Sequence, residues 1–257
     1  MGSSLVTVGP RLAAVLVVLA GMAVVGARVS GLRQERAVGV AVARATVQLA
    51  VVSAVLVPVV SSLVLSTVFV VLMVAVAALT AGGRISGRSV REPAVRRRLP
   101  AVVLPVAGGA LPVAALVVAS GAVPLRGVAV IPVAGILIGG AMTATSLAGR
   151  RMREELTARR GEVEAALSLG LPSRDAVLLI ARDSSATALV PPLDQTRTVG
   201  LVTLPGAFVG VLLGGGSPLQ AGAAQLLVLV GLLAADVLAV WIVGELVARG
   251  RLIDVPH

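Results

Sequence analysis

The sequence predicts an all-α polytopic membrane protein with about seven transmembrane helices, a helical hairpin on the cytosolic side and an N-terminus outside the cell. Hydrophobic residues make up 57% of the 257 positions, whereas soluble domains are about 45–50% apolar. Apolar stretches long enough to cross a bilayer recur along the chain, and one long segment between Arg150 and Arg197 is charged instead. We interpret residues 1–257 as a single transmembrane domain that exposes residues 150–198 to the cytosol.

The expected membrane helices follow from stretch length. A bilayer core ~30 Å thick requires about 20 helical residues. The first and sixth stretches are shorter, so we expect tilting or local thinning there. The predicted spans are Leu12–Ala27, Val38–Val57, Ser61–Thr80, Leu99–Ser120, Gly127–Gly149, Val199–Leu213 and Leu219–Val247.

Arginine placement orients these spans. All 22 basic residues are arginines, and most lie in loops on one side of the predicted bundle, whereas Arg11 and Arg126 lie on the other side. The positive-inside rule places the arginine-rich side in the cytosol. The alternative for the first stretch is a cleaved signal peptide. The charge does not indicate a nucleic-acid partner, because the aromatic residues available to stack on bases are only Phe69, Phe208 and Trp241.

Missing residue types exclude several chemistries. The chain has no lysine and no cysteine, and its one histidine is the last residue, His257. A P-loop lysine, a zinc finger and a Ser-His-Asp triad are therefore absent. We predict no catalytic residue and no cofactor in this chain. An intramembrane enzyme built on Ser184 and Ser185 near Asp183 is a weaker alternative, because no base accompanies them.

The charged segment predicts two helices. Residues 152–169 are rich in good helix formers, and Glu155 lies four residues before Arg159, a favourable helical pair. Gly170 and the following Pro172 should end this helix. Ser173 can cap a second helix that runs to about Val190, where Pro191 and Pro192 should stop it.

The turn between these helices is a candidate docking element. Ala165, Ala166 and Leu169 form a small apolar strip that could enter a groove on another protein, with Glu164 at its edge and Gly170 at the turn. The alternative is a solvated hairpin at the membrane surface. A rigid hairpin of this kind would transmit force from a partner into the adjoining transmembrane helices.

These residues carry a resemblance to a known family. Glu164, Ala165, Ala166, Gly170 and Ile180 match the spacing of the coupling loop of bacterial ABC importer permeases, but Arg182-Asp183 stands where that pattern has Leu-Pro. Over most of the chain the sequence more closely resembles the FetB-type iron-export permeases and their plant relatives of aluminium tolerance. That likeness is carried by residues 44–49, 139–148, 164–170, 199–206 and 214–218.

The resemblance implies a permease that exports a small solute, such as iron or another metal ion, and lacks its own ATPase site. It implies a separate ABC ATPase subunit that binds ATP-Mg, two copies of each subunit and therefore a permease homodimer. Gly140 and Ala207-Phe208 replace the Asn and Met expected from the family. The alternatives are a non-transporting membrane assembly protein, a partner-free channel and an ABC permease for a non-metal substrate.

Polar residues inside the predicted spans are candidates for the substrate path, because intramembrane polar groups pair or line a pathway. Arg44 and Gln48 share one helix face. For Arg44 there are three alternatives: its side chain extends to the cytosol, pairs with a carboxylate, or contacts an anion. Asp236 lies deep in the last span, where it pairs with Arg44 or binds a cation or proton. Met142 and Gln225 complete the set, while the identity of any metal ligand stays open.

Small residues in the sixth span predict close helix packing, a dimer seam or a moving gate. Gly206, Gly210 and Gly214 recur every fourth residue and line one helix face. Pro205 precedes them, and we expect it to kink a helix, together with Pro105, Pro112 and Pro132.

Overall fold

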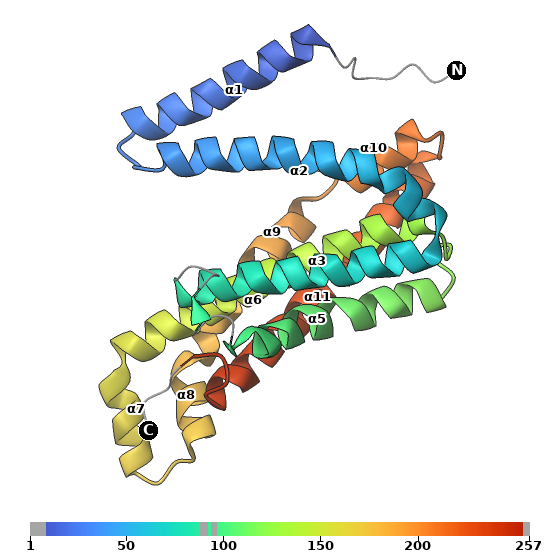
Figure 1. Cartoon of the computed structure of the whole chain (residues 1–257). Coiled ribbons are helices and arrows are strands. Elements are labelled where there is room, and N and C mark those ends of the chain that lie inside the picture. The colour runs from blue at the N-terminus through green and yellow to red at the C-terminus, as the bar shows by residue number, and fades with distance from the viewer. Residues whose placement is uncertain (1–8, 88–91, 94–96, 254–257) are drawn as a thin grey trace. The chain divides into compact units, whose positions relative to one another are not determined.

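A computed structural model describes residues 9–87, 92–93 and 97–253, and every regular element in these ranges is a helix (Figure 1). The chain divides into two compact units, Met1–Pro58 and Val59–His257. The predicted topology arginines Arg88, Arg91 and Arg96 and the histidine His257 lie outside the described residues.

The first unit contains α1 (Pro10–Val29) and most of α2 (Glu35–Ser61). A short turn joins them, in which Gly31 and Arg33 have φ values of 69° and 53°. Most side chains of both helices are apolar and exposed, as expected where lipid can replace a protein neighbour. These two helices match the first and second predicted spans.

The second unit is built around four long helices: α3 (Leu63–Ser86), α5 (Leu99–Ala119), α6 (Gly127–Ala158) and α11 (Pro218–Ala248). Small residues allow these helices to approach closely. A Cβ atom on Gly109 of α5 would lie 2.6 Å from the carbonyl oxygen of Ala235 on α11. The predicted internal prolines Pro105 and Pro112 lie inside α5, and Pro132 lies inside α6.

Seven helical segments in the described residues are long and apolar enough to cross a membrane. The chain is therefore a multi-pass membrane protein, and six of the predicted spans correspond to α1, α2, α3, α5, α6 and α11. α6 contains 32 residues, so it is about 48 Å long and exceeds a bilayer core of ~30 Å. Its charged end, which begins at Arg150, extends beyond the apolar part.

The sixth predicted span is wrong in its boundaries. Residues 199–205 are not helical, and Gly200 has a φ of 83°. The helix that follows, α10 (Gly206–Leu213), has 8 residues and is too short to cross a bilayer alone. This stretch is apolar throughout, so its composition does not indicate the turn, which Gly200 makes possible. The seventh candidate span is instead Ser173–Thr198, which overlaps the predicted cytosolic hairpin.

The predicted effect of proline is wrong at two places. Pro191 and Pro192 do not stop a helix but form the first turn of α9 (Val190–Thr198), which follows α8 (Ser173–Ala186) and a short 3₁₀ turn, η1 (Thr187–Leu189). Pro205 does not kink a helix, because it precedes the first residue of α10. Both outcomes follow from the missing N–H of proline, which is harmless at a helix N-terminus.

Candidate functional site

The candidate site is the helical hairpin of α7 (Arg160–Ser168) and α8, which continues directly from α6. Arg159 lies at the junction and donates hydrogen bonds to Glu155 at 3.2 Å and to Glu162 at 2.7 Å. The predicted Glu155–Arg159 pair is therefore confirmed. The hydrogen bond from Arg159 lowers the pKa of the Glu162 carboxyl below its ordinary value, and the two glutamates raise the pKa of Arg159. These bonds link the end of α6 to the first turn of α7.

The hairpin turns at Gly170, as predicted. The N–H of Leu171 donates to the carbonyl of Ala166 at 3.1 Å, and the N–H of Gly170 donates to the carbonyl of Leu167 at 2.9 Å. Gly170 has a φ of 89°, so this pair of bonds is a Schellman motif with glycine in the left-handed position. The predicted cap at Ser173 is wrong, because Ser173 is the first residue of α8 and its side chain makes no cap.

The predicted docking strip is only partly available to a partner. Glu164, Ala165, Leu169 and Gly170 are exposed, with Leu169 81% exposed. Ala166 is buried, like Val163 one turn earlier, and these two residues fix α7 against the rest of the unit. Glu164 accepts a hydrogen bond from Arg160 at 2.8 Å. The exposed part of the hairpin therefore presents an apolar side chain, Leu169, and a charged pair, Arg160–Glu164.

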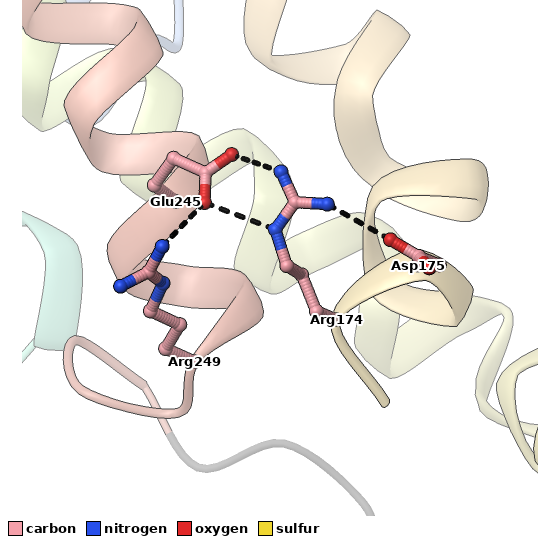
Figure 2. Close-up of polar contacts among 4 residues, drawn as sticks. All are labelled: Arg174, Asp175, Glu245 and Arg249. Atoms are coloured by element: carbon pink, nitrogen blue, oxygen red, sulfur yellow. Dashed lines mark hydrogen bonds and ion pairs between the residues drawn. The ribbon is translucent and has the colours of Figure 1, made fainter. Parts of the chain in front are cut away.

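Ion pairs connect α8 to the end of α11 (Figure 2). The Arg174 guanidinium donates to both carboxylate oxygens of Glu245, with its Nε atom at 3.1 Å from Oε2. Glu245 also accepts from Arg249 at 3.4 Å, and Arg174 donates to Asp175 at 2.9 Å. A bidentate arginine–carboxylate pair fixes orientation as well as distance. We call Arg174, Asp175, Glu245 and Arg249 the α8–α11 clasp.

Apolar packing supports the clasp. Val177 and Ala181 on α8 are fully buried, as is Val243 on α11. A Cβ atom on Gly244 would lie 3.9 Å from Leu178 of α8, so the two helices meet over a small residue. The clasp joins residues 71 positions apart, and no local spacing in the sequence indicates it.

Other arginines connect the same ends of the long helices. Arg153 of α6 donates to the carbonyl oxygen of Ser86, the last residue of α3, at 2.6 Å. Arg98, just before α5, donates to the carbonyl oxygen of Leu252, just after α11, at 3.2 Å. Arginines predicted only as topology signals thus also satisfy carbonyl groups at helix ends.

Gln225, a predicted substrate-path residue, is 4% exposed and accepts a hydrogen bond at 3.2 Å from the N–H of Phe208. Phe208 lies in the first turn of α10, so this bond satisfies an otherwise unpaired helix donor. A Cβ atom on either of the predicted packing glycines Gly206 and Gly210 would have no neighbour within 4 Å, and one on Gly214 would meet only backbone of α10. Within the described residues of the second unit, no helix packs on this glycine face.

The remaining predicted path residues lie in different places. Arg44 and Gln48 lie exposed on α2 in the first unit. Met142 is half-buried on α6. Asp236 is 3% exposed on α11, and its Oδ1 atom has no hydrogen-bond partner among the described residues. Gln225 and Asp236 are 11 residues apart, about 16 Å along α11. Their joint role in a substrate path stays a prediction.

No group of three or more His, Cys, Asp or Glu side chains occurs within metal-binding reach in the part of the chain that the structure describes. Ser184, considered above as an enzyme candidate, instead borders a shallow open depression between α6 and α8. The depression is also lined by Arg151, Glu154, Glu155, Ala158 and Thr187. Ser185 is buried and donates to the carbonyl of Arg182 at 2.6 Å.

The architecture defines a class: a multi-pass helical membrane protein in which a charged helical hairpin is clasped to the last membrane helix. Comparison with known proteins gives the family. Residues 11–251 match the family described as "Uncharacterised protein family (UPF0014)", and the chain belongs to this family.

Curated relatives include two plant proteins and one bacterial permease. The chain is 45% identical over 100 residues to "UPF0014 membrane protein STAR2" of Oryza sativa subsp. japonica, a match that covers 39% of this chain and 35% of the relative. It is 41% identical over 100 residues to "Protein ALUMINUM SENSITIVE 3" of Arabidopsis thaliana, covering 39% and 37%. It is 36% identical over 99 residues to "Probable iron export permease protein FetB" of Escherichia coli (strain K12), covering 38% of each.

These matches span little more than a third of each relative's length. The resemblance expected from the sequence motifs is confirmed at the level of the family. No solved structure matches the chain significantly.

Proposed function

We propose that this chain is the permease subunit of an ABC-type exporter in the plasma (bacterial inner) membrane, and that a separate ATPase docks on the α7–α8 hairpin. The supporting relative is the one named as an iron export permease, which favours a metal ion such as iron as the solute. The proposed complex contains two permease copies and two ATPase copies, with ATP-Mg bound to the ATPase.

The observation that carries this proposal is the double attachment of the hairpin. On one side α7 continues from α6 through the Arg159 junction. On the other side α8 is joined to α11 by the Arg174–Glu245 pair. A hairpin that no partner contacts would gain nothing from being joined to two long membrane helices, whereas a hairpin that transmits force would. A docked partner that moves the hairpin therefore moves α6 and α11.

The mechanism follows from this geometry. ATP-driven closure of the two ATPase subunits would pull their docking surfaces together and tilt the attached hairpins. Because α6 and α11 contact each other and each is joined to the hairpin, the tilt changes how these two helices pack on each other. Such rigid-body motion about packed helices is a common way to alternate access to a transport path.

Charge reversal at the hairpin tip tests docking. Glu164→Arg should reverse the charge on the exposed face of α7 and abolish co-purification of the ATPase. Glu154→Arg is a matched control, because Glu154 is also the second member of an exposed Arg–Glu pair four residues apart, on α6 outside the hairpin. Full ATPase binding by Glu164→Arg, or equal loss in both variants, would contradict docking at the tip.

Flux through the complex distinguishes a transporter from an assembly protein. Vesicles that contain both subunits should export Fe²⁺ only with ATP, and the Glu164→Arg variant should lose this flux in parallel with ATPase binding. An assembly protein would bind the ATPase equally well but show no ATP-dependent flux. If Fe²⁺ does not move but another solute does, the metal assignment is wrong and the permease assignment stands.

A further inference from the structure

Asp236 is an acid buried between two membrane helices. It lies on α11 with 3% of its surface exposed, and its Oδ1 atom has no hydrogen-bond partner among the described residues. Across the interface stands Gly140 of α6, where a Cβ atom would lie 2.7 Å from Oδ1 and 2.2 Å from the Cδ1 atom of Leu232. The carboxyl therefore occupies the space that the missing side chain at position 140 leaves.

Among the described residues of this unit, no charged side chain on the helices packed against α11 serves as a counter-charge for Asp236. α5 contains no charged residue, and α6 contains none before Arg150, ten residues from Gly140, or about 15 Å along the helix. On α11 the next charged residue is Glu245, about 13 Å away along the helix, and it is already bound to Arg174 and Arg249.

The shorter helices that contact α11 do not change this result. On α9, Arg197 pairs with Asp194 at 3.4 Å, and both side chains are more than 60% exposed. On α8, Arg174 and Asp175 belong to the clasp, and Arg182 and Asp183 are not buried. Neither η1 nor α10 contains a charged residue.

An ionised carboxylate in such a site would be energetically unfavourable. A charged side chain at the centre of a membrane helix costs roughly 2.5–3.5 kcal/mol even on the lowest scales. A protonated carboxyl avoids this cost, because its O–H can donate to a carbonyl of the preceding helical turn. The arrangement therefore favours the neutral acid while α6 and α11 are closed on each other.

We propose that Asp236 is a proton-binding site, which holds a proton while α6 and α11 are packed together and releases it to water when the two helices separate. The proton comes from water and returns to water, so no other reactant is needed. The site would make any motion that separates α6 from α11 sensitive to pH. This proposal stands whether or not an ATPase drives that motion.

Infrared spectroscopy of the full-length protein in liposomes tests the proposal directly. The carbonyl stretch of a protonated carboxylic acid should be present at neutral pH and should shift in D₂O. Asp236→Asn should lose this signal. Glu245→Gln, which removes the neighbouring acid of the same helix, is the matched control and should keep it.

Two further variants protect the test against misfolding and against a competing explanation. Asp236→Glu keeps a carboxyl and should keep the protonated carbonyl signal. If the signal is lost in Asp236→Asn but kept in Asp236→Glu, general unfolding cannot explain the loss. Arg44→Gln separates proton binding from an ion pair. If the signal is absent in the unmodified protein and appears only in Arg44→Gln, Asp236 is ionised and paired with Arg44, and the proposal is overturned. Absence of the signal in every variant overturns it as well.

Discussion

Two regions of the second unit use opposite physical means to hold helices together. Along the membrane part of α6 and α11, contact depends on shape: Gly140 admits Asp236 and Leu232 at distances no other residue would allow. At the α7–α8 hairpin, ion pairs are added to the apolar contacts: Arg159 and Arg174 each join two helical elements through carboxylates. One region is held by apolar packing alone, and the other combines buried apolar residues with exposed ion pairs.

The difference shows how a membrane protein can separate stability from response. Close packing in an apolar interior is insensitive to salt and strongly sensitive to volume. Exposed ion pairs are weak and are screened by salt. The α6–α11 contact is therefore suited to hold the bundle, and the hairpin attachments are suited to be adjusted by a partner or by conditions.

The largest effect on stability should come from adding a single methyl group to the contact between α6 and α11. Gly140→Ala places a Cβ atom into contact with Asp236 and Leu232, and overpacking of this kind destabilises by about 1–3 kcal/mol. Thermal unfolding in detergent should show a clearly lower Tm.

Gly139→Ala is the control for that experiment. Gly139 has no atom within 4 Å of its Cβ position, and replacing helical glycine by alanine stabilises by about 0.5–1 kcal/mol. Its Tm should be unchanged or slightly higher. Equal destabilisation of both variants would show that α6 and α11 do not meet closely at position 140.

The turn of the hairpin should show the next largest effect. Gly170 has a φ of 89°, and a left-handed conformation costs a non-glycine residue about 1–2 kcal/mol. Gly170→Ala should loosen the turn, so limited proteolysis between α7 and α8 should become faster. Gly161→Ala, in the first turn of α7 and open to solvent, should leave the cleavage rate unchanged or reduce it.

The sequence predicts the parts of this structure that depend on local composition. Six spans follow from continuous apolar stretches, and the Glu155–Arg159 pair and the Gly170 turn follow from residues within one or two helical turns of each other. The sixth span failed because apolarity alone does not distinguish a helix from the turn at residues 199–205. The helix end predicted at Pro191 and Pro192 was wrong because proline occurs both after the end and in the first turn of helices. Which of the two occurs depends on tertiary packing.

Two central features could not be predicted from the sequence for a different physical reason. The Arg174–Glu245 pair and the Gly140–Asp236 contact each join residues far apart in the chain, and their partners are chosen by helix packing. The sequence identified Asp236 as unusual but offered only Arg44 as its partner. That pairing stays a prediction, because Arg44 belongs to the other unit.

The α8–α11 clasp should contribute less to stability than the packing does, but more to coupling. Glu245→Gln removes the bidentate acceptor of Arg174, so Tm should fall less than for Gly140→Ala, since the pair is partly exposed. In the proposed exporter, ATP-dependent flux should fall several-fold while ATPase binding is retained. The double variant Arg174→Glu/Glu245→Arg should restore part of the flux.

Salt provides the complementary measurement for the clasp. High ionic strength should reduce flux in the unmodified protein towards that of Glu245→Gln, because exposed ion pairs are screened. Arg249→Gln, which removes only the longer 3.4 Å contact, should have a smaller effect. Loss of ATPase binding in Glu245→Gln would mean that the clasp shapes the docking surface and does not transmit motion.

The smallest effect should be a pH dependence at the junction of α6 and α7. The pKa of Glu162 is lower in the folded protein than its ordinary value, because Arg159 stabilises the carboxylate. Its stabilising contribution is therefore fully present above the ordinary pKa of glutamate and is lost as the pH falls through the lowered value. Hydrogen exchange of the α7 amides should become faster over that acidic range, and Glu162→Gln should remove this part of the pH dependence. The same profile in Glu162→Gln would show that the acid sensitivity of α7 does not come from the Arg159–Glu162 pair.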